Sequence, residues 1–92
     1  MKMLLKRILN MASNKSNNLL TFEWDSGNEV LEIHGNKKGL EKLKDIIDSL
    51  LAKPNNDHTH LMTKSWGGEE LSDDKQCSEN ILINHVKLFK WD

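Results

Sequence analysis

Residues Asn36–Asn56, NKKGLEKLKDIIDSLLAKPNN, carry the clearest structural pattern of this 92-residue chain. The apolar residues in this stretch recur mostly at steps of three and four, which is typical of one apolar stripe along an amphipathic helix. These residues are Leu40, Leu43, Ile46, Ile47, Leu50 and Leu51. Asn36 is a suitable N-cap, and Pro54 cannot continue a helix. The pattern therefore predicts a helix over Lys37–Lys53 that packs on a sheet.

Strand-like segments lie on both sides of this helix. Before it, Leu19–Trp24 and Glu29–His34 are separated by the turn residues Asp25–Asn28, which predicts a β-hairpin. After it, we expect strands over Asp57–Thr63 and Ile81–Trp91. The expected order is β-β-α-β-β, an α+β fold in which a four-stranded, mainly antiparallel sheet carries one helix on one face.

Alternation along each strand predicts which side chains meet the helix. From the second strand we expect Leu31 and Ile33 to do so. The other strand residues expected on this side are Thr59, Leu61, Leu82, Val86 and Leu88. The helix residues expected to contact them are Leu40, Leu43, Ile47 and Leu50. The residues expected on the opposite face are Val30, Glu32, His34, His58, His60, Met62, His85, Lys87 and Phe89. All four histidines of the chain then share the helix-free face.

The first 18 residues differ from the rest of the chain. MKMLLKRILNMA, residues 1–12, has apolar residues at helical spacing and a basic opposite side, but so short an isolated helix is marginal in water. SNKSNN, residues 13–18, reads as a polar linker. We expect residues 1–18 to form a basic, loosely attached leader, helical only when docked, and residues 19–92 to form a single domain. Contact of the leader with a membrane surface is the alternative.

Composition limits the classes of function. A formal net charge of −1 gives no global reason to expect nucleic acid or an anionic membrane as a partner. The single cysteine, Cys77, cannot form an internal disulfide, which favours a reducing compartment. The apolar runs are shorter than the roughly 18–20 residues that span a bilayer. The sequence therefore predicts a soluble, cytoplasmic protein.

The clustered histidines allow three interpretations. Neutral imidazoles bind zinc and copper, so the face that carries His58 and His60 is a candidate metal site. The spacing matches no established ligand motif, however, and an open polar face includes histidines by chance. The third interpretation is a recognition surface, because histidine can donate, accept and stack near neutral pH.

The loop Lys64–Asn80 presents Trp66 directly before Gly67–Gly68. Glycine lets the backbone take angles that a Cβ forbids, and tryptophan is enriched among the residues that dominate protein interfaces. Trp66 therefore either anchors a partner or tucks over a sheet edge to close the core. We expect the other two tryptophans, Trp24 and Trp91, to be structural.

Acidic residues follow in the same loop, among them Glu69, Glu70 and Asp73. Adjacent carboxylates can serve as acid and base, or they can form a solvated surface. We expect a helical turn near Asp73–Cys77, where the negative charge does not favour a reactive thiolate at Cys77. The glycine pair lacks the lysine and hydroxyl residues of a phosphate-binding loop. Nothing here is a catalytic signature, so the residues predict a binding domain that is not an enzyme.

Three segments together resemble the immunity protein 32 family of bacterial polymorphic toxin systems. They are LEIHGNKKGLEKL (Leu31–Leu43), DHTHLMTKSWGGEELS (Asp57–Ser72) and ENILINHVKLFKW (Glu79–Trp91). The resemblance covers about Phe22–Trp91, and SWGGEEL, Ser65–Leu71, is its most specific part. It implies a protein that binds and neutralises the toxic domain of a cognate toxin, without a cofactor.

The site expected on physical grounds combines an aromatic anchor with charge. We expect toxin binding by Trp66, Glu69, Glu70 and Asp73, with His58 and His60 on the adjacent sheet face. Acidic side chains would suit the basic cleft of a nuclease toxin. The rival hypotheses are a small His-rich metal-binding protein or metal-dependent hydrolase, and an adaptor that oligomerises through its edge strand.

Overall fold

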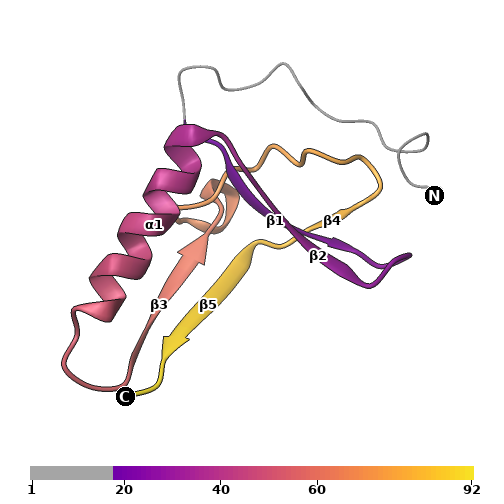
Figure 1. Cartoon of the computed structure of the whole chain (residues 1–92). Helices are drawn as coiled ribbons and strands as arrows, with labels where there is room; N and C mark the ends of the chain where they lie inside the picture. Colours follow the sequence, from indigo (N-terminus) through magenta and orange to yellow (C-terminus); the bar gives the residue numbers. More distant parts are fainter. Residues whose placement is uncertain (1–17) are drawn as a thin grey trace.

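The computed structural model describes residues 18–92, and Figure 1 shows how their helices and strands are arranged. The expected leader lies outside the described residues, apart from Asn18. The elements are β1 (Leu20–Asp25), β2 (Val30–Gly35), α1 (Lys37–Leu51), β3 (Asp57–Met62), the 3-10 helix η1 (Lys64–Trp66), β4 (Ile81–Leu82) and β5 (His85–Lys90). One helix with antiparallel strands confirms the predicted α+β class.

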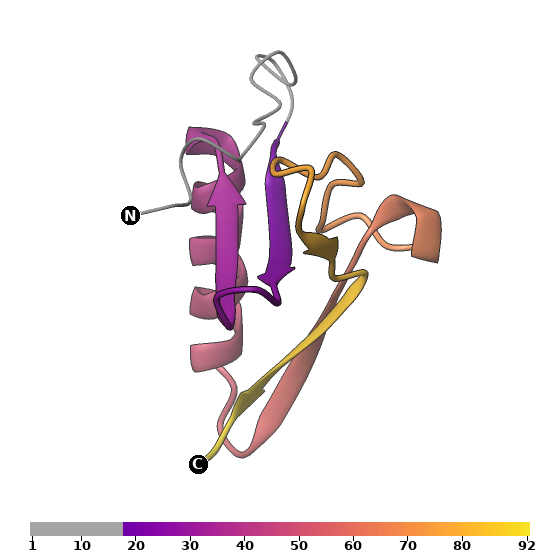
Figure 2. The ribbon, with the colours of Figure 1, turned by 90° about the vertical axis from the view of Figure 1, so that its right-hand side faces the viewer.

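The strands form two antiparallel sheets in place of the expected four-stranded one. The first sheet has the order β2-β1-β4, and the second pairs β3 with β5. Figure 2 shows β3 and β5 running at a steep angle to β1 and β2. The predicted last strand is divided between the sheets, because Ile83 N–H donates to Phe22 O (2.9 Å) while Asn84 O accepts from Thr63 N–H (3.1 Å). Ile83 and Asn84 therefore join the two sheets.

This interruption also shifts the alternation of side chains. Ile83, Val86 and Leu88 all pack against the core, so two core residues are three positions apart across the break. Leu82 instead pairs with Glu23, on the face opposite to the core. The prediction that Leu82 faces the helix is therefore wrong, because a period of two holds only within an unbroken strand.

The core lies where α1, β1 and β3 meet. Its buried members are Leu20, Phe22, Leu61 and Leu71, and Leu43, Ile46, Ile83, Val86 and Leu88 pack against them. At the start of α1, the Asn36 Oδ1 atom accepts from Gly39 N–H (2.7 Å), which confirms the predicted N-cap. Gly39 leaves room for a close approach, since a Cβ there would lie 1.7 Å from Leu19 O. The helix ends at Leu51, two residues before the predicted end at Lys53.

The predicted packing of α1 against β2 is wrong. Leu31 and Ile33 point toward the helix side as expected, but they are 53% and 48% exposed. Leu40 and Ile47 are also exposed on α1. Figure 1 gives the reason: β2 is an edge strand, and α1 runs away from it after the Gly35–Asn36 junction. The helix therefore covers the start of β1 and leaves these aliphatic side chains open.

The other face of the first sheet is covered by the segment 72–80. Its anchor is the buried carboxylate of Glu23. Glu23 Oε2 accepts from Thr21 Oγ1 (2.6 Å) and Gln76 N–H (2.7 Å), and Oε1 accepts from Cys77 N–H (3.2 Å) and Asn80 Nδ2 (3.0 Å). Burial raises the pKa of Glu23, but these hydrogen bonds together bring it below its ordinary value.

The helical turn expected near Asp73–Cys77 is not formed, because the N–H groups of Gln76 and Cys77 donate to Glu23 and not along a helix. Cys77 itself is buried.

Candidate functional site

The helix-free face of the β3–β5 sheet carries an unbroken row of rings. In the ladder His58 lies opposite Phe89, and Met62 lies opposite His85. Leu61 and Val86 point into the core from the same strands, so the alternation predicted for this sheet is confirmed. We name this surface the aromatic face. Its residues are Trp66, His85, His60, His58, Phe89 and Trp91.

Each ring of the aromatic face contacts the next. His60 stacks on His85 with ring centroids 5.0 Å apart, and His58 stacks on Phe89 at 5.1 Å. His58 and His60 meet edge to face at 4.9 Å. The row continues to Trp91, which stacks on Phe89 at 5.6 Å, and to Trp66, which lies 6.5 Å from His85. These separations are in the range of favourable aromatic pairs.

The imidazoles are also coupled electrostatically. His60 Nδ1 lies 2.8 Å from His85 Nε2, so one of these nitrogens donates and the other accepts. Burial lowers the pKa of His60, and His58, His85 and Lys87 lower it further because each opposes a second positive charge. The Lys87 ammonium lies 5.4 Å above the Phe89 ring. None of the six residues of the aromatic face is acidic.

A tight turn places Trp66 at the end of this row. Trp66 closes η1, and Gly67 follows at φ 89°, the left-handed region that favours glycine. Gly67 N–H donates to Lys64 O (2.9 Å). A side chain at Gly68 would collide with Met62, whose carbonyl oxygen lies 2.5 Å from the Cβ position. The glycine pair thus folds the chain back under Trp66, which stays 58% exposed and does not close the core.

The three predicted carboxylates do not join the aromatic face. Glu70 Oε1 accepts from Met62 N–H (3.0 Å), and Asp73 accepts from the Oγ (2.8 Å) and N–H (3.2 Å) of Ser65. Both therefore hold the turn in place. Glu69 is exposed, and its carbonyl oxygen accepts from Lys42 Nζ on α1 (2.6 Å).

These carboxylates line an open hollow on the side of β3 that faces α1. The hollow is lined by Asn18, Lys42, Lys64, Gly68, Glu69, Glu70, Leu71, Ser72, Asp73 and Asp74. The structure thus brings His58, His60 and Trp66 together but places the carboxylates on a neighbouring surface. It adds Phe89 and Trp91, of which Trp91 was expected to be structural and is 71% exposed. Their alternation with Leu88 and Lys90 in the last strand was the available signal.

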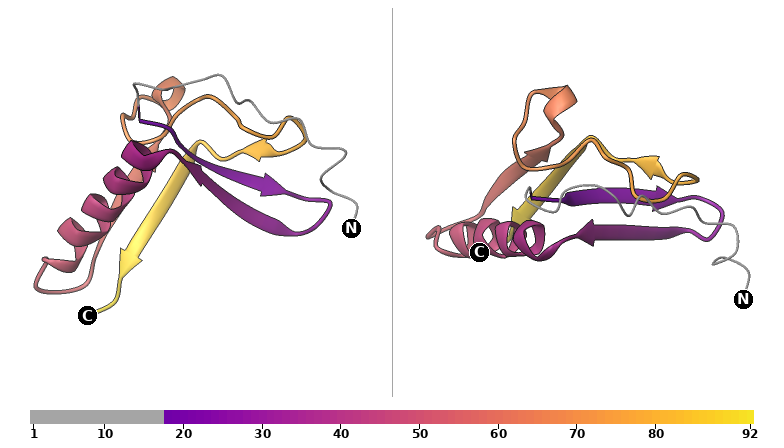
Figure 3. Two further views of the ribbon diagram at one scale, coloured as in Figure 1. Left: turned by 45° about the horizontal axis from the view of Figure 1, so that its top comes forward. Right: turned by 90° about the horizontal axis from the view of Figure 1, so that it is seen from above.

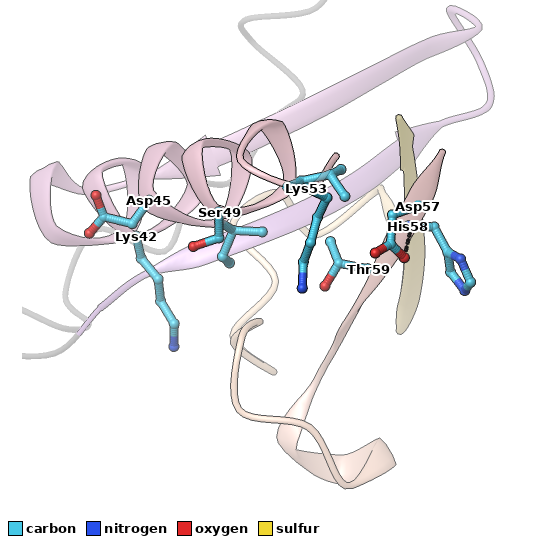
Figure 4. Close-up of a pocket in the computed structure, with 9 residues that line it drawn as sticks. Lys42, Asp45, Ser49, Lys53, Asp57, His58 and Thr59 are labelled. Carbon is cyan, nitrogen blue, oxygen red and sulfur yellow. Dashed lines mark hydrogen bonds between the residues drawn. The ribbon is translucent and has the colours of Figure 1, made fainter. Parts of the chain in front are cut away.

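Figure 4 shows a second hollow, between α1 and β3. It has a volume of about 430 Å³, and its polar lining includes Lys42, Asp45 and Lys53. Asp57 Oδ1 accepts from the backbone N–H of His58 (2.7 Å), while the His58 ring points away from the helix. Lys42 and Asp45 lie on α1, Lys53 follows the helix and Asp57 lies on β3, and their charged ends do not converge on one point.

The four histidines do not form one site. The prediction that all four share one face is wrong, because His34 belongs to the first sheet, where its Nε2 lies 2.8 Å from Glu32 Oε1. Among residues 18–92, no group of three or more His, Cys, Asp or Glu side chains is arranged to hold a metal ion. Within the same range, no helix is long and apolar enough to cross a membrane.

Aromatic residues are enriched at protein–protein interfaces, and here they are exposed in one row. The family model described as immunity protein 32 matches residues 30–86, which is more than half of the chain. The chain belongs to the immunity protein 32 family, which confirms the resemblance seen in its sequence. Comparison with curated proteins and with solved structures gave no match.

Proposed function

We propose that this protein binds and neutralises a cognate bacterial toxin domain, and that the aromatic face is its main contact surface. Membership of the immunity protein 32 family supports the immunity role. The observation that carries the choice of surface is the exposure of Trp66, Phe89 and Trp91 in one continuous row. Clustered exposed aromatic residues mark interaction surfaces in soluble proteins.

The construction of this face favours tight binding. Its rings stand on two strands paired over six residues, and each ring is held by its neighbours. Side chains that are ordered before binding lose less conformational entropy when a partner arrives. Trp66 projects from a turn that Gly67, Glu70 and Asp73 hold in place. The toxin would therefore meet a rigid surface.

The two neighbouring surfaces differ in charge, and we assign them different roles in binding. The aromatic face has no carboxylate and suits a partner patch of apolar groups and hydrogen-bond acceptors. Glu69, Glu70 and Asp73 lie beside it and would act as rim charges that attract a basic toxin cleft. In this proposal the protein acts by binding in the bacterial cytoplasm as part of a polymorphic toxin system, and it needs no cofactor.

Co-expression with a candidate toxin domain, if a neighbouring gene encodes one, tests the proposal. We expect wild type to restore growth and the double variant Trp66→Ala, Trp91→Ala to fail at equal protein level. Leu51→Ala is a matched control, because Leu51 is an equally exposed large apolar residue on α1. Full protection by the double variant would reject the aromatic face as the contact surface. Failure of wild type against that toxin would reject the cognate pairing itself.

A further inference from the structure

A second apolar surface lies on the opposite side of the molecule, and toxin binding by the aromatic face does not use it. We name it the aliphatic face. Its exposed residues are Leu31 and Ile33 of β2 and Leu40, Ile47 and Leu51 of α1. Contiguous exposed apolar surface on a small soluble domain is usually covered by a partner or by another segment of the chain.

The aliphatic face lies in the open angle between the β1–β2 hairpin and α1. Ile33 pairs with Phe22, a core residue, and therefore points to the side of the sheet that α1 occupies. On α1, Leu40 and Ile47 lie two turns apart on one flank. The two stripes meet at Gly35, where a Cβ would lie 2.8 Å from Leu40 Cδ2. Figure 3 shows α1 and the β1–β2 hairpin separating from this point.

The described chain begins at the vertex of this angle. Leu19 N–H donates to Asn36 Oδ1 (3.0 Å), and Asn36 N–H donates to Leu19 O (3.1 Å). Leu19 is therefore fixed at the point where β2 ends and α1 begins. The chain before Leu19 is attached next to the aliphatic face, and Asn18 also lines the hollow that carries Glu69, Glu70 and Asp73.

The sequence of residues 1–17 complements the rest of the chain. Leu4, Leu5, Ile8 and Leu9 are spaced so that one side of a helix would carry them all. This segment has four of the thirteen basic residues and none of the fourteen acidic ones. Residues 18–92 therefore have nine basic and fourteen acidic residues, a formal net charge of −5.

The linker is long enough for residues 1–9 to contact the aliphatic face of the same chain. The nine residues 10–18 can span about 30 Å when extended, whereas the 15 residues of α1 extend over about 22 Å. A tether of this kind gives an effective concentration on the order of millimolar, so a weak contact is enough for occupancy.

We propose that the aliphatic face is the docking site of the protein's own residues 1–17, with Leu4, Leu5, Ile8 and Leu9 covering Leu31, Ile33, Leu40, Ile47 and Leu51. Docking shields an apolar surface that would otherwise join two copies of the chain. It leaves the aromatic face open to a partner.

Paramagnetic labelling of the full chain tests the docking. A nitroxide is attached at Asn10→Cys, since the native Cys77 is buried and protected from the reagent. We expect strong broadening of the methyl signals of Ile33 and Ile47 and little change at Met62, which lies on the opposite face of β3 from the core. Adding Leu5→Asp and Ile8→Asp should abolish the broadening, while the charge-matched pair Asn14→Asp and Ser16→Asp should retain it.

Three results would overturn this proposal. The first is no broadening at Ile33 and Ile47 with the wild-type leader. The second is equal broadening at Met62. The third is broadening in a mixture of isotope-labelled protein without nitroxide and unlabelled protein that carries it, since this would show that a second copy covers the face. Because no toxin is present, a negative result here is distinct from failure of the proposed function.

Discussion

Replacing Glu23 by Gln is the most informative single perturbation of this fold. The buried carboxylate accepts four hydrogen bonds and ties β1 to the segment 72–80. Glutamine keeps one accepting oxygen, but its NH₂ group would face two donors. Hydrogen bonds to charged groups contribute about 1.5–3 kcal/mol each, so loss of two predicts a decrease of about 3–6 kcal/mol in the free energy of unfolding. This is a large part of the 5–15 kcal/mol typical of a domain.

The pH dependence gives this prediction a second test. Because the pKa of Glu23 is lowered in the folded state, its stabilisation is fully present above the unfolded pKa. It is lost as the pH falls through the lowered folded value. The difference between wild type and Glu23→Gln should therefore be largest near neutral pH and shrink in acid, below about pH 4.

Urea unfolding followed by tryptophan fluorescence measures both quantities. Glu79→Gln is the matched control, since Glu79 is an exposed carboxylate near the end of the same segment. We expect this control to unfold like wild type. The reasoning is refuted if Glu23→Gln has the wild-type urea midpoint at pH 7, or if its deficit persists unchanged in acid.

Three further predictions concern the core, the turn and the imidazoles. Leu43→Ala should lower the free energy of unfolding by about 2 kcal/mol, the low end of the range for core leucines because Leu43 is only partly buried, whereas Ile47→Ala on the exposed flank should have a much smaller effect in thermal melts. Gly67→Ala should lower stability by about 1 kcal/mol, because its φ of 89° strains any residue with a Cβ; equal melting temperatures would contradict this. His85→Ala should move the pKa of His60 part of the way up toward its ordinary value, as NMR titration can measure, with burial still holding it down.

The sequence predicts the elements whose causes are local. The stripe of α1 and the N-cap at Asn36 follow from residues within one helix. The outward position of His58, His60, His85 and Phe89 follows from alternation within unbroken strands. For these residues the period of the pattern and the structure agree.

Features that depend on distant residues could not be predicted. The segment near Gln76 is not helical because its N–H groups bond Glu23, 53 positions earlier. The break at Ile83 arises because the strand changes partners there. Leu31 and Ile33 read as core residues, yet the direction of α1 leaves them exposed, and no residue pattern encodes that direction.

The sequence predicted those parts of the candidate site that depend on local patterns and missed those that depend on contacts formed in the folded turn. Alternation placed His58, His60 and His85 on one face, and the glycine pair indicated a presented Trp66. Glu70 and Asp73 read as free surface charge, but their hydrogen bonds to Met62 and Ser65 stabilise the turn. Only the folded turn shows that the carboxylates and the tryptophan belong to different surfaces.

Indole N–H signals of the three tryptophans give the most direct test that the aromatic face binds the toxin. Trp66 and Trp91 are exposed on this face, whereas Trp24 is half-buried in the first sheet and serves as an internal control. Titration of the ¹⁵N-labelled protein with the cognate toxin domain should shift or broaden the Trp66 and Trp91 signals and leave Trp24 nearly unchanged. A complex that perturbs Trp24 but neither Trp66 nor Trp91 would contradict the assignment.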